Sequence, residues 1–205
     1  KVLESNNYVL GEEVRRFEKN FSKFHKSKFA VSTKNGTDSL VLALKCLNIK
    51  KGDEVITTAH TALATVASIV SVGAKPVIVD IEKDFYTIDP YQLKKAISKK
   101  TKAIIPVHIF GNVFDVFSLR KLIPKKISII EDAAQAHGSS FDGKKAGSLS
   151  NLATFSFYPT KNLGGCGDSG AITTNSVQYY DKLLKMRNLG MKNKDEFVEF
   201  GMNSR

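Results

Sequence analysis

Cysteine is scarce in this sequence: among 205 residues only Cys46 and Cys166 occur. They lie in unlike surroundings, so they predict neither a disulfide framework nor a zinc site, and they suit a reducing cytoplasm. No run of about eighteen apolar residues occurs, so no membrane span is predicted. The opening residues, Lys1 to Glu4, lead into polar sequence and do not resemble a secretory signal. We therefore expect a cytoplasmic protein that does not associate with membranes.

Acidic residues are also few: 20 aspartates and glutamates stand against 31 lysines and arginines, for a net charge of +11. Such a balance can indicate nucleic acid, a membrane surface or an anionic ligand. The lysines, however, are scattered as separate pairs, such as Lys50-Lys51 and Lys99-Lys100. No basic stripe is interleaved with aromatic residues. We interpret these charges as solvated faces and expect no nucleic-acid partner.

The sequence does contain a regular alternation of short apolar runs and amphipathic segments. The apolar runs predict strands at 29–32, 53–57, 76–80, 103–107, 128–132, 152–157 and 170–174. The segments between them predict helices near 14–24, 39–47, 64–72, 90–97, 116–122 and 176–188. This alternation indicates an α/β fold of three layers, with a mostly parallel sheet covered on both faces. No linker or internal repeat divides the chain.

Several polar residues directly follow strands of this predicted sheet. Asn35-Gly36-Thr37 comes after the first strand and opens a helix, where free backbone N–H groups and the helix dipole favour an anion. Asp132 ends another strand, and the loop that contains His60 follows a third. Open α/β sheets bind ligands beyond the carboxyl ends of their strands. We therefore expect these residues to lie together at one edge.

The stretch from Thr154 to Ala171 is rich in features. A strand-like run ends at Pro159, Lys161 follows two residues later, and glycines occur at 164, 165, 167 and 170. Glycine at this density lets the backbone adopt positive φ and approach a ligand closely. A lysine beside such a loop can act as a nucleophile or Schiff-base former. A solvated turn lysine is the plain alternative in a lysine-rich chain.

Together these residues offer an anion site, a carboxylate, a hydroxyl and a lysine. A carboxylate at the buried end of a strand needs a partner, because an unpaired buried charge is costly. A protonated pyridine nitrogen would supply that partner. A lysine can form an imine with an aldehyde, and a glycine turn with a serine can hold a phosphate. These are the needs of pyridoxal 5′-phosphate (PLP), and they include no metal.

Four motifs then resemble a known family. They are Asn35-Gly36-Thr37-Asp38-Ser39-Leu40, Glu131-Asp132-Ala133-Ala134-Gln135-Ala136-His137-Gly138, Ser156-Phe157 with Lys161-Asn162-Leu163, and Gly167-Asp168-Ser169-Gly170-Ala171. In this order they resemble the DegT/DnrJ/EryC1/StrS aminotransferases, which are sugar aminotransferases of the aspartate-aminotransferase fold, fold type I. The resemblance runs from Tyr8-Val9-Leu10-Gly11 to Gly201-Met202-Asn203-Ser204-Arg205, nearly the whole chain.

The resemblance implies roles around the cofactor ring. Lys161 would bind the cofactor aldehyde covalently and later shuttle a proton. Asp132 would pair with the pyridinium nitrogen. Gln135 would lie near the ring or its O3′ oxygen.

The resemblance also implies a phosphate site shared between subunits. Gly36 and Thr37 would donate to the phosphate, with Ser156 beside them. Asn203 matches the asparagine with which family members reach the phosphate of the neighbouring subunit. That role requires a homodimer with shared active sites.

Two departures from the family pattern matter. In the family an aromatic residue that stacks on the ring often follows the loop threonine, but here Ala62 follows Thr61. His60 is the nearest flat side chain and is expected to stack instead, unless it is a hydrogen-bonded loop residue. Family chains also continue into a smaller C-terminal domain, whereas this one stops inside a motif and begins without methionine. We expect residues 1–205 to be mainly the PLP-binding large domain.

Other residues have plainer interpretations. His108 follows a strand and could face the site, but a core or loop position is the plainer interpretation. His137, beside Gly138, is expected to be structural, and His25 is expected at the surface. Cys166 has no histidine partner within its motif, so it is not predicted to be a nucleophile.

We predict a PLP-dependent aminotransferase that moves an amino group, in this family most often from glutamate, to a nucleotide-linked keto sugar. One alternative is a sugar dehydratase, but in that branch of the family a histidine replaces the lysine. The other is a non-catalytic binding or regulatory protein of the same fold. The presence of the cofactor-contacting residues argues against a decayed site.

Overall fold

The computed structural model describes all 205 residues, Lys1–Arg205. Its strands are β1 (Phe29–Thr33), β2 (Glu54–Thr58), β3 (Lys75–Val79), β4 (Thr101–Ile105), β5 (Ser128–Asp132), β6 (Ser140–Phe141), β7 (Lys144–Lys145), β8 (Leu152–Ser156) and β9 (Gly170–Thr174). Its helices are α1 (Val2–Ser5), α2 (Glu12–His25), α3 (Gly36–Cys46), α4 (Leu63–Ser71), α5 (Pro90–Ala96), α6 (Val116–Leu122), α7 (Val177–Met186) and the 3-10 turn η1 (Ile109–Gly111). Every strand and helix predicted from the sequence is present.

The main sheet has seven strands in the order β1-β9-β8-β5-β4-β2-β3. Only β9 runs antiparallel to its neighbours, β1 and β8. The remaining pairs are parallel, so the predicted mostly parallel sheet is confirmed. Because β1 and the parallel strands share one direction, their carboxyl ends lie at the same edge. The second sheet is the small hairpin β6-β7.

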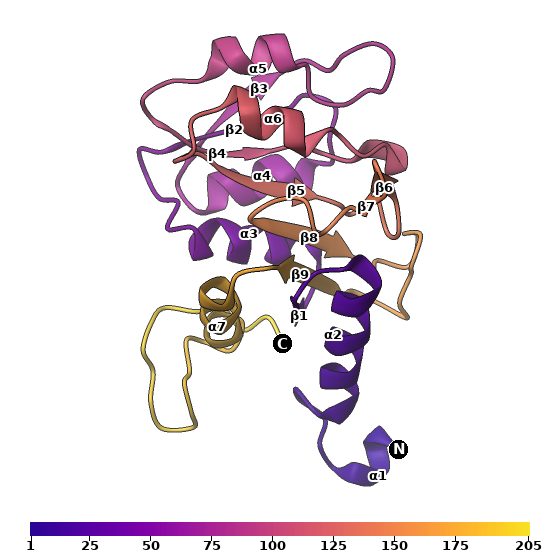
Figure 1. Cartoon of the computed structure of the whole chain (residues 1–205). Helices are drawn as coiled ribbons and strands as arrows, with labels where there is room; N and C mark the ends of the chain where they lie inside the picture. Colours follow the sequence, from indigo (N-terminus) through magenta and orange to yellow (C-terminus); the bar gives the residue numbers. More distant parts are fainter.

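Helices cover both faces of the sheet, which gives the predicted three layers (Figure 1). One core packs α3, α4 and α7 against the sheet through residues such as Leu42, Ile69 and Leu183. On the other face, Leu93 of α5 and Leu119 of α6 belong to a second core. A third cluster joins α2 to β8 and β9. Successive strand residues alternate between these cores, as the pleat of a buried strand requires.

Four helices begin at side-chain caps that the sequence supplies. Asn35, Asp89, Asp115 and Ser176 each accept a hydrogen bond from a backbone N–H in the first turn. The prediction of Asp89 as a cap with a proline after it is confirmed. Such caps satisfy donors that a helix leaves free. They fix where each helix starts, and at Asn35 the helix starts at Gly36, three residues before the predicted position.

Short elements escaped prediction: α1, η1 and the β6-β7 hairpin, whose strands have two residues each. None of the helices is both long and apolar enough to cross a membrane. Cys46 is buried, Cys166 is exposed, and both are free thiols.

The surface position expected for His25 is wrong, because this side chain is completely buried at the end of α2. Its Nδ1 lies 2.7 Å from the carbonyl oxygen of Ala146. Its ring packs against Phe21 and Phe155. Phe24, which has the expected helical spacing, is instead 54% exposed. The predicted face holds at Phe17 and Phe21, and only in the last turn does His25 take the buried position expected for Phe24.

Candidate active site

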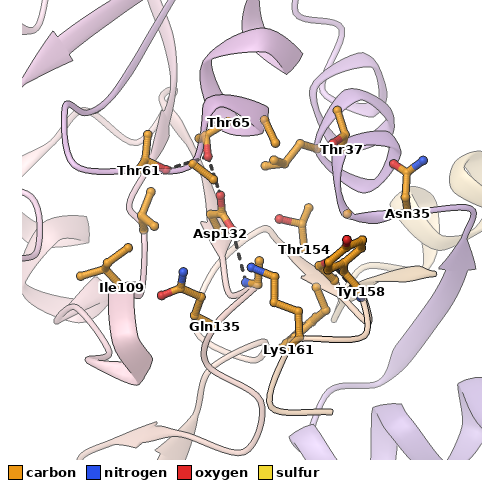
Figure 2. A pocket seen from close by; sticks show the side chains of 18 of the residues that line it. Asn35, Thr37, Thr61, Thr65, Ile109, Asp132, Gln135, Thr154, Tyr158 and Lys161 are labelled. Atoms are coloured by element: carbon orange, nitrogen blue, oxygen red, sulfur yellow. Dashed lines mark hydrogen bonds between the residues drawn. The ribbon is translucent and has the colours of Figure 1, made fainter. Parts of the chain in front are cut away.

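A cavity of about 310 Å³ opens at the carboxyl edge of the sheet. That volume lies at the small end of the usual range for small-molecule sites, roughly 300–1,000 Å³. Its walls come from the ends of β5 and β8, the first turns of α3 and α4, and the loop after β4. Of the residues expected at the site, Gly36, Thr37, Asp132, Gln135, Ser156 and Lys161 all line it. Figure 2 shows Thr37, Asp132, Gln135 and Lys161 among its labelled residues.

The turn between β1 and α3 forms one side of the cavity. The Asn35 side chain accepts the Asp38 N–H at 2.7 Å and so holds the turn closed. The N–H groups of Gly36 and Thr37 precede the first intrahelical bond, which is the case for the first turn of any helix. A Cβ atom at Gly36 would lie 2.7 Å from the Cβ atom of Ser156. Glycine therefore lets this turn approach Ser156, and the N–H groups of the turn with the Ser156 hydroxyl form a corner that can bind an anion.

Asp132 is the buried carboxylate of the cavity, with only 5% of its surface exposed. Its Oδ2 accepts the Thr65 hydroxyl at 2.8 Å, and its Oδ1 accepts the Ala134 N–H at 3.2 Å. Burial raises the pKa of this carboxyl above its ordinary value, and the two hydrogen bonds oppose the rise. No cationic side chain forms an ion pair with it. The carboxylate is therefore suited to a ligand that brings a positive charge.

Lys161 enters the cavity from the loop after β8, where its N–H closes a turn onto the Tyr158 carbonyl at 2.8 Å. Figure 2 shows its side chain extending toward Asp132 and Gln135. The amine belongs to none of the ion pairs of the structure. A free amine beside an unpaired buried carboxylate is an arrangement that can bind an aldehyde and move protons.

The glycines near Lys161 serve a different purpose from the one predicted. None of Gly164, Gly165, Gly167 and Gly170 has a positive φ, so that prediction is wrong. Instead, a Cβ atom at Gly164 would lie 2.4 Å from the Pro159 carbonyl oxygen. At Gly170 it would lie 2.5 Å from the Asn35 carbonyl oxygen. These glycines allow close packing of the loop and of β9 against the Asn35 turn.

Gln135 lines the same cavity from the segment after β5. Its Oε1 accepts the backbone N–H of Phe110 at 2.8 Å. Phe110 has a φ of 54°, a left-handed conformation that a bulky residue rarely adopts. This bond joins the loop after β4 to the loop after β5 at the cavity wall.

Two of the expected site residues do not line the cavity. His60 is exposed, and its ring lies edge-on to Phe110, with centroids 5.6 Å apart, and to Tyr86, 6.2 Å apart. Its neighbours Thr61 and Ala62 line the cavity instead. Asn203 is also exposed, and it pairs as an isolated bridge with Asn188, outside the cavity of its own chain.

His137 is only partly buried, whereas His108 is completely buried, as the plain interpretation expected. The Nδ1 of His108 accepts the Phe114 N–H at 3.2 Å, so its proton resides on Nε2, which faces Glu131 at 3.0 Å. His137 packs against Phe155 and Phe157, and neither ring nitrogen has a partner. Burial, with His25 nearby, lowers the pKa of His137 to about 4.

Sequence reasoning missed the threonines of the cavity. Thr61, Thr65 and Thr154 all line it. Thr65 lies in the first turn of α4, and Thr61 comes two residues before the helix begins. No local pattern in the sequence marks this pair, because only the fold brings Thr65 to Asp132, 67 positions away.

The cavity thus has an anion-binding corner at Gly36, Thr37 and Ser156, a buried carboxylate and a free amine. Figure 2 places Thr37 and Thr61 on opposite sides, with Asp132 between them. The donor set fits a ligand that carries a phosphate at one end, an aldehyde, and a basic ring nitrogen. PLP has these three groups.

Comparison with known proteins also indicates an aminotransferase. The model of the family described as the DegT/DnrJ/EryC1/StrS aminotransferase family matches residues 1–205. A "dTDP-3-amino-3,4,6-trideoxy-alpha-D-glucose transaminase" of Streptomyces venezuelae is 42% identical over 100% of this chain and 54% of its own length. A "UDP-2-acetamido-2-deoxy-3-oxo-D-glucuronate aminotransferase" of Pseudomonas aeruginosa is 40% identical over 100% of this chain and 57% of its own. A "Pleiotropic regulatory protein" of Geobacillus stearothermophilus is 42% identical over 100% and 55%.

Solved structures agree with the fold. The chain is similar to S. venezuelae DesV in complex with a ketimine intermediate, with a TM-score of 0.97 and 42% identity over 100% of this chain and 55% of that one. It is also similar to the PLP form of the "Putative sugar aminotransferase Spr1654 from Streptococcus pneumoniae", with a TM-score of 0.89 and 28% identity over 98% of this chain and 58% of that one. The chain spans about half the length of the curated relatives it matches.

Proposed function

This chain belongs to the DegT/DnrJ/EryC1/StrS aminotransferase family, and on that premise we propose that it is the PLP-binding large domain of an aminotransferase acting on a nucleotide-linked keto sugar. The observation that carries the proposal is the meeting of Lys161, Asp132 and the Gly36–Ser156 corner in one cavity. Each of these groups matches one functional group of the cofactor. Similarity to transaminases of nucleotide-linked sugars over the whole chain supports the substrate class.

Each residue then has a defined task. The N–H groups of Gly36 and Thr37, with the Ser156 hydroxyl, would hold the phosphate. Asp132 would accept a hydrogen bond from the protonated ring nitrogen. Burial away from water strengthens such a charge-assisted hydrogen bond.

Lys161 and Gln135 would act at the reactive side of the ring. When bound, PLP supplies an electron sink for the carbon next to the transferred amine. Lys161 would hold the aldehyde through Nζ, and after release the same amine would carry the proton to and from the substrate carbon. Gln135 would contact the ring or its O3′ oxygen.

We also infer the two substrates. The amino group would come from an amino acid, with glutamate as the proposed donor. The acceptor would be the ketone of a sugar attached to a nucleotide. The names of both transaminase relatives contain a 3-amino or a 3-oxo sugar. We therefore propose that the amino group is added at C3 of the sugar.

A regulatory function is the second candidate, because one relative at 42% identity is described as a pleiotropic regulatory protein. A purely regulatory protein would not need a free lysine and a buried carboxylate in one cavity. A sugar dehydratase would carry histidine in place of Lys161. Both observations favour the aminotransferase.

Borohydride reduction of the cofactor-loaded protein tests the proposal. Reduction should bleach the visible absorbance band, and peptide mapping should find the pyridoxyl group on Lys161. Lys34→Ala is a matched control, because Lys34 is exposed beside the Asn35 turn and does not line the cavity. Label on another lysine, or a protein that binds no PLP, would refute the assignment.

We further propose a homodimer in which Asn203 of each subunit donates to the phosphate in the other. A phosphate dianion needs several donors, and one helix turn with one serine leaves oxygen atoms unpaired. The exposed position of Asn203, outside its own cavity, supports this arrangement. The unpaired cysteines suit the cytoplasm, which we propose as the location.

Subunit mixing tests the shared site. An Asn203→Ala subunit mixed with a Lys161→Ala subunit gives dimers with one intact site and one doubly altered site. Activity should therefore return on mixing in the intact protein. Absence of recovery despite demonstrated subunit exchange would rule out the trans contact.

A further inference from the structure

A chain of two hydroxyl groups leads from the wall of the cavity to Asp132. The Thr65 hydroxyl donates to Asp132 Oδ2 at 2.8 Å, and Thr61 Oγ1 lies 2.7 Å from Thr65 Oγ1 (Figure 2). Thr65 is completely buried, whereas Thr61 is partly exposed. A buried hydroxyl without a partner is costly, so the threonine at position 65 requires these contacts.

The direction of the chain depends on the charge of Asp132. Each hydroxyl has a single proton to donate. When Asp132 is ionised, Thr65 donates its proton to that hydrogen bond and so must accept the hydrogen bond of the Thr61 hydroxyl. When Asp132 is protonated on Oδ2, the carboxyl donates to Thr65, and the Thr65 hydroxyl no longer donates to Asp132. The Ala134 N–H, bound to Oδ1 at 3.2 Å, can only donate and favours the ionised form.

We propose that Thr65, oriented by Thr61, is a positioning residue that holds Asp132 ionised and aimed at the ring nitrogen of the cofactor. The inference rests on the proposed function, since it assigns Thr65 a role at the same site. Asp132 is the last residue of β5, and its backbone fixes the direction of the Cα–Cβ bond but not the rotation of the carboxylate. The Thr65 hydroxyl on Oδ2 and the Ala134 N–H on Oδ1 together set the plane of the carboxylate. The oxygen lone pairs that remain are available to a donor in the cavity.

The test compares two ligands in the intact apoprotein. One is PLP, and the other is its analogue with a C–H group in place of the ring nitrogen. Absorbance or fluorescence titration gives a dissociation constant for each, and their ratio isolates the ring-nitrogen contact. Thr65→Val keeps the size and removes the donor, so the preference for PLP should fall roughly tenfold or more, the usual worth of a hydrogen bond to a charged group. Thr65→Ser should restore it.

Controls separate this inference from a general loss of stability. Thr173→Val makes the same chemical change at a completely buried threonine whose hydroxyl bonds the Gly147 carbonyl at 2.6 Å, away from Asp132. That variant should keep the wild-type ratio. Thr61→Val, at a partly exposed position, should lower the ratio several-fold and serves if Thr65→Val does not fold.

The outcomes distinguish the two proposals. A wild-type protein that binds no PLP overturns the proposed function. If Asp132→Asn lowers the ratio but neither threonine variant does, the role of Thr65 is overturned and the proposed function stands. A lowered ratio in Thr65→Val that Thr65→Ser does not restore also counts against it, because the hydroxyl would then not be the cause.

Discussion

Glu131 and Asp132 are adjacent carboxylates on β5, and the protein surrounds them differently. Glu131 is completely buried, and four donors reach it: Gly147 and Leu149 N–H, the Ser150 hydroxyl and His108 Nε2, at 2.9–3.0 Å. Asp132 has two donors and faces the cavity. Because successive strand residues point to opposite faces, one side of β5 is closed by the protein and the other is left incomplete. An incomplete carboxylate is the one that a ligand can complete.

Neutralising the incomplete carboxylate should have the largest effect on activity. Asp132→Asn removes the charge that would keep the ring nitrogen protonated. We expect kcat to fall by several orders of magnitude, at about 1.4 kcal/mol per tenfold. The unfolding free energy should change little or rise, because a buried charge is lost. Near-normal turnover in this variant would contradict the role of Asp132.

Removing Glu131, the carboxylate whose hydrogen bonds are all made by the protein, should lower the unfolding free energy more than any of the other substitutions. Glu131→Ala leaves His108 Nε2 and the N–H groups of Gly147 and Leu149 buried without an acceptor. We expect a loss of about 3 kcal/mol or more in unfolding free energy, because each buried donor left without an acceptor costs about 1–3 kcal/mol. Urea denaturation of the cofactor-free protein measures it. A loss of activity with unchanged stability would break the comparison.

The glycine at the anion corner offers a smaller test on the open side. Gly36→Ala places a Cβ atom 2.7 Å from Ser156 Cβ, which should cost about 1–3 kcal/mol by overpacking. The loss should appear mainly as weaker PLP binding. Gly167→Ala is the matched control, because a Cβ atom there meets nothing within 4 Å and φ is not positive. Equal losses in the two variants would show that the corner is not special.

His108 and His137 repeat the comparison on a smaller scale. His108 is fully paired, while both ring nitrogens of His137 lack partners and burial lowers its pKa to about 4. Between that value and the unfolded value of about 6.5, the unfolded state binds more protons, so stability should fall as pH drops. His137→Phe should flatten this slope in denaturation curves at pH 4.5–6.5, whereas exposed His60→Phe should not. If the unfolding free energy of His137→Phe depends on pH as steeply as that of the wild type, groups other than His137 cause the dependence.

The sequence predicted the regular elements well because each strand is buried on both faces or followed by an amphipathic helix. It could not predict β6-β7, whose strands have two residues each, because no pattern exists at that length. Ligands bind at the carboxyl ends of parallel strands, and this rule correctly predicted that Gly36, Asp132 and Lys161 line one cavity. It placed His60 there as well, yet that ring lies against Tyr86 and Phe110, which come from distant loops.

Long-range packing also explains the remaining differences. His25 is buried where the carbonyl oxygen of Ala146, 121 positions away, accepts a hydrogen bond from its Nδ1–H. No local pattern in the sequence predicts that contact. The Thr65–Asp132 bond spans 67 positions and was missed for the same reason. Periodicity predicts which residues share a face, but not which partner that face meets.

The bond between Gln135 and the Phe110 backbone has a consequence for the polarity of the cavity. A main-chain N–H can only donate, so the Gln135 amide must turn its oxygen toward Phe110 and its NH₂ group the other way. Gln135 then acts as a donor of two protons rather than as an interchangeable donor or acceptor. Every residue except proline supplies an N–H at position 110, so substitutions that keep its left-handed backbone, such as glycine or asparagine, leave this orientation intact. The cavity therefore favours a hydrogen-bond acceptor beside the Gln135 NH₂ group, and the backbone N–H of residue 110, rather than its side chain, sets this preference.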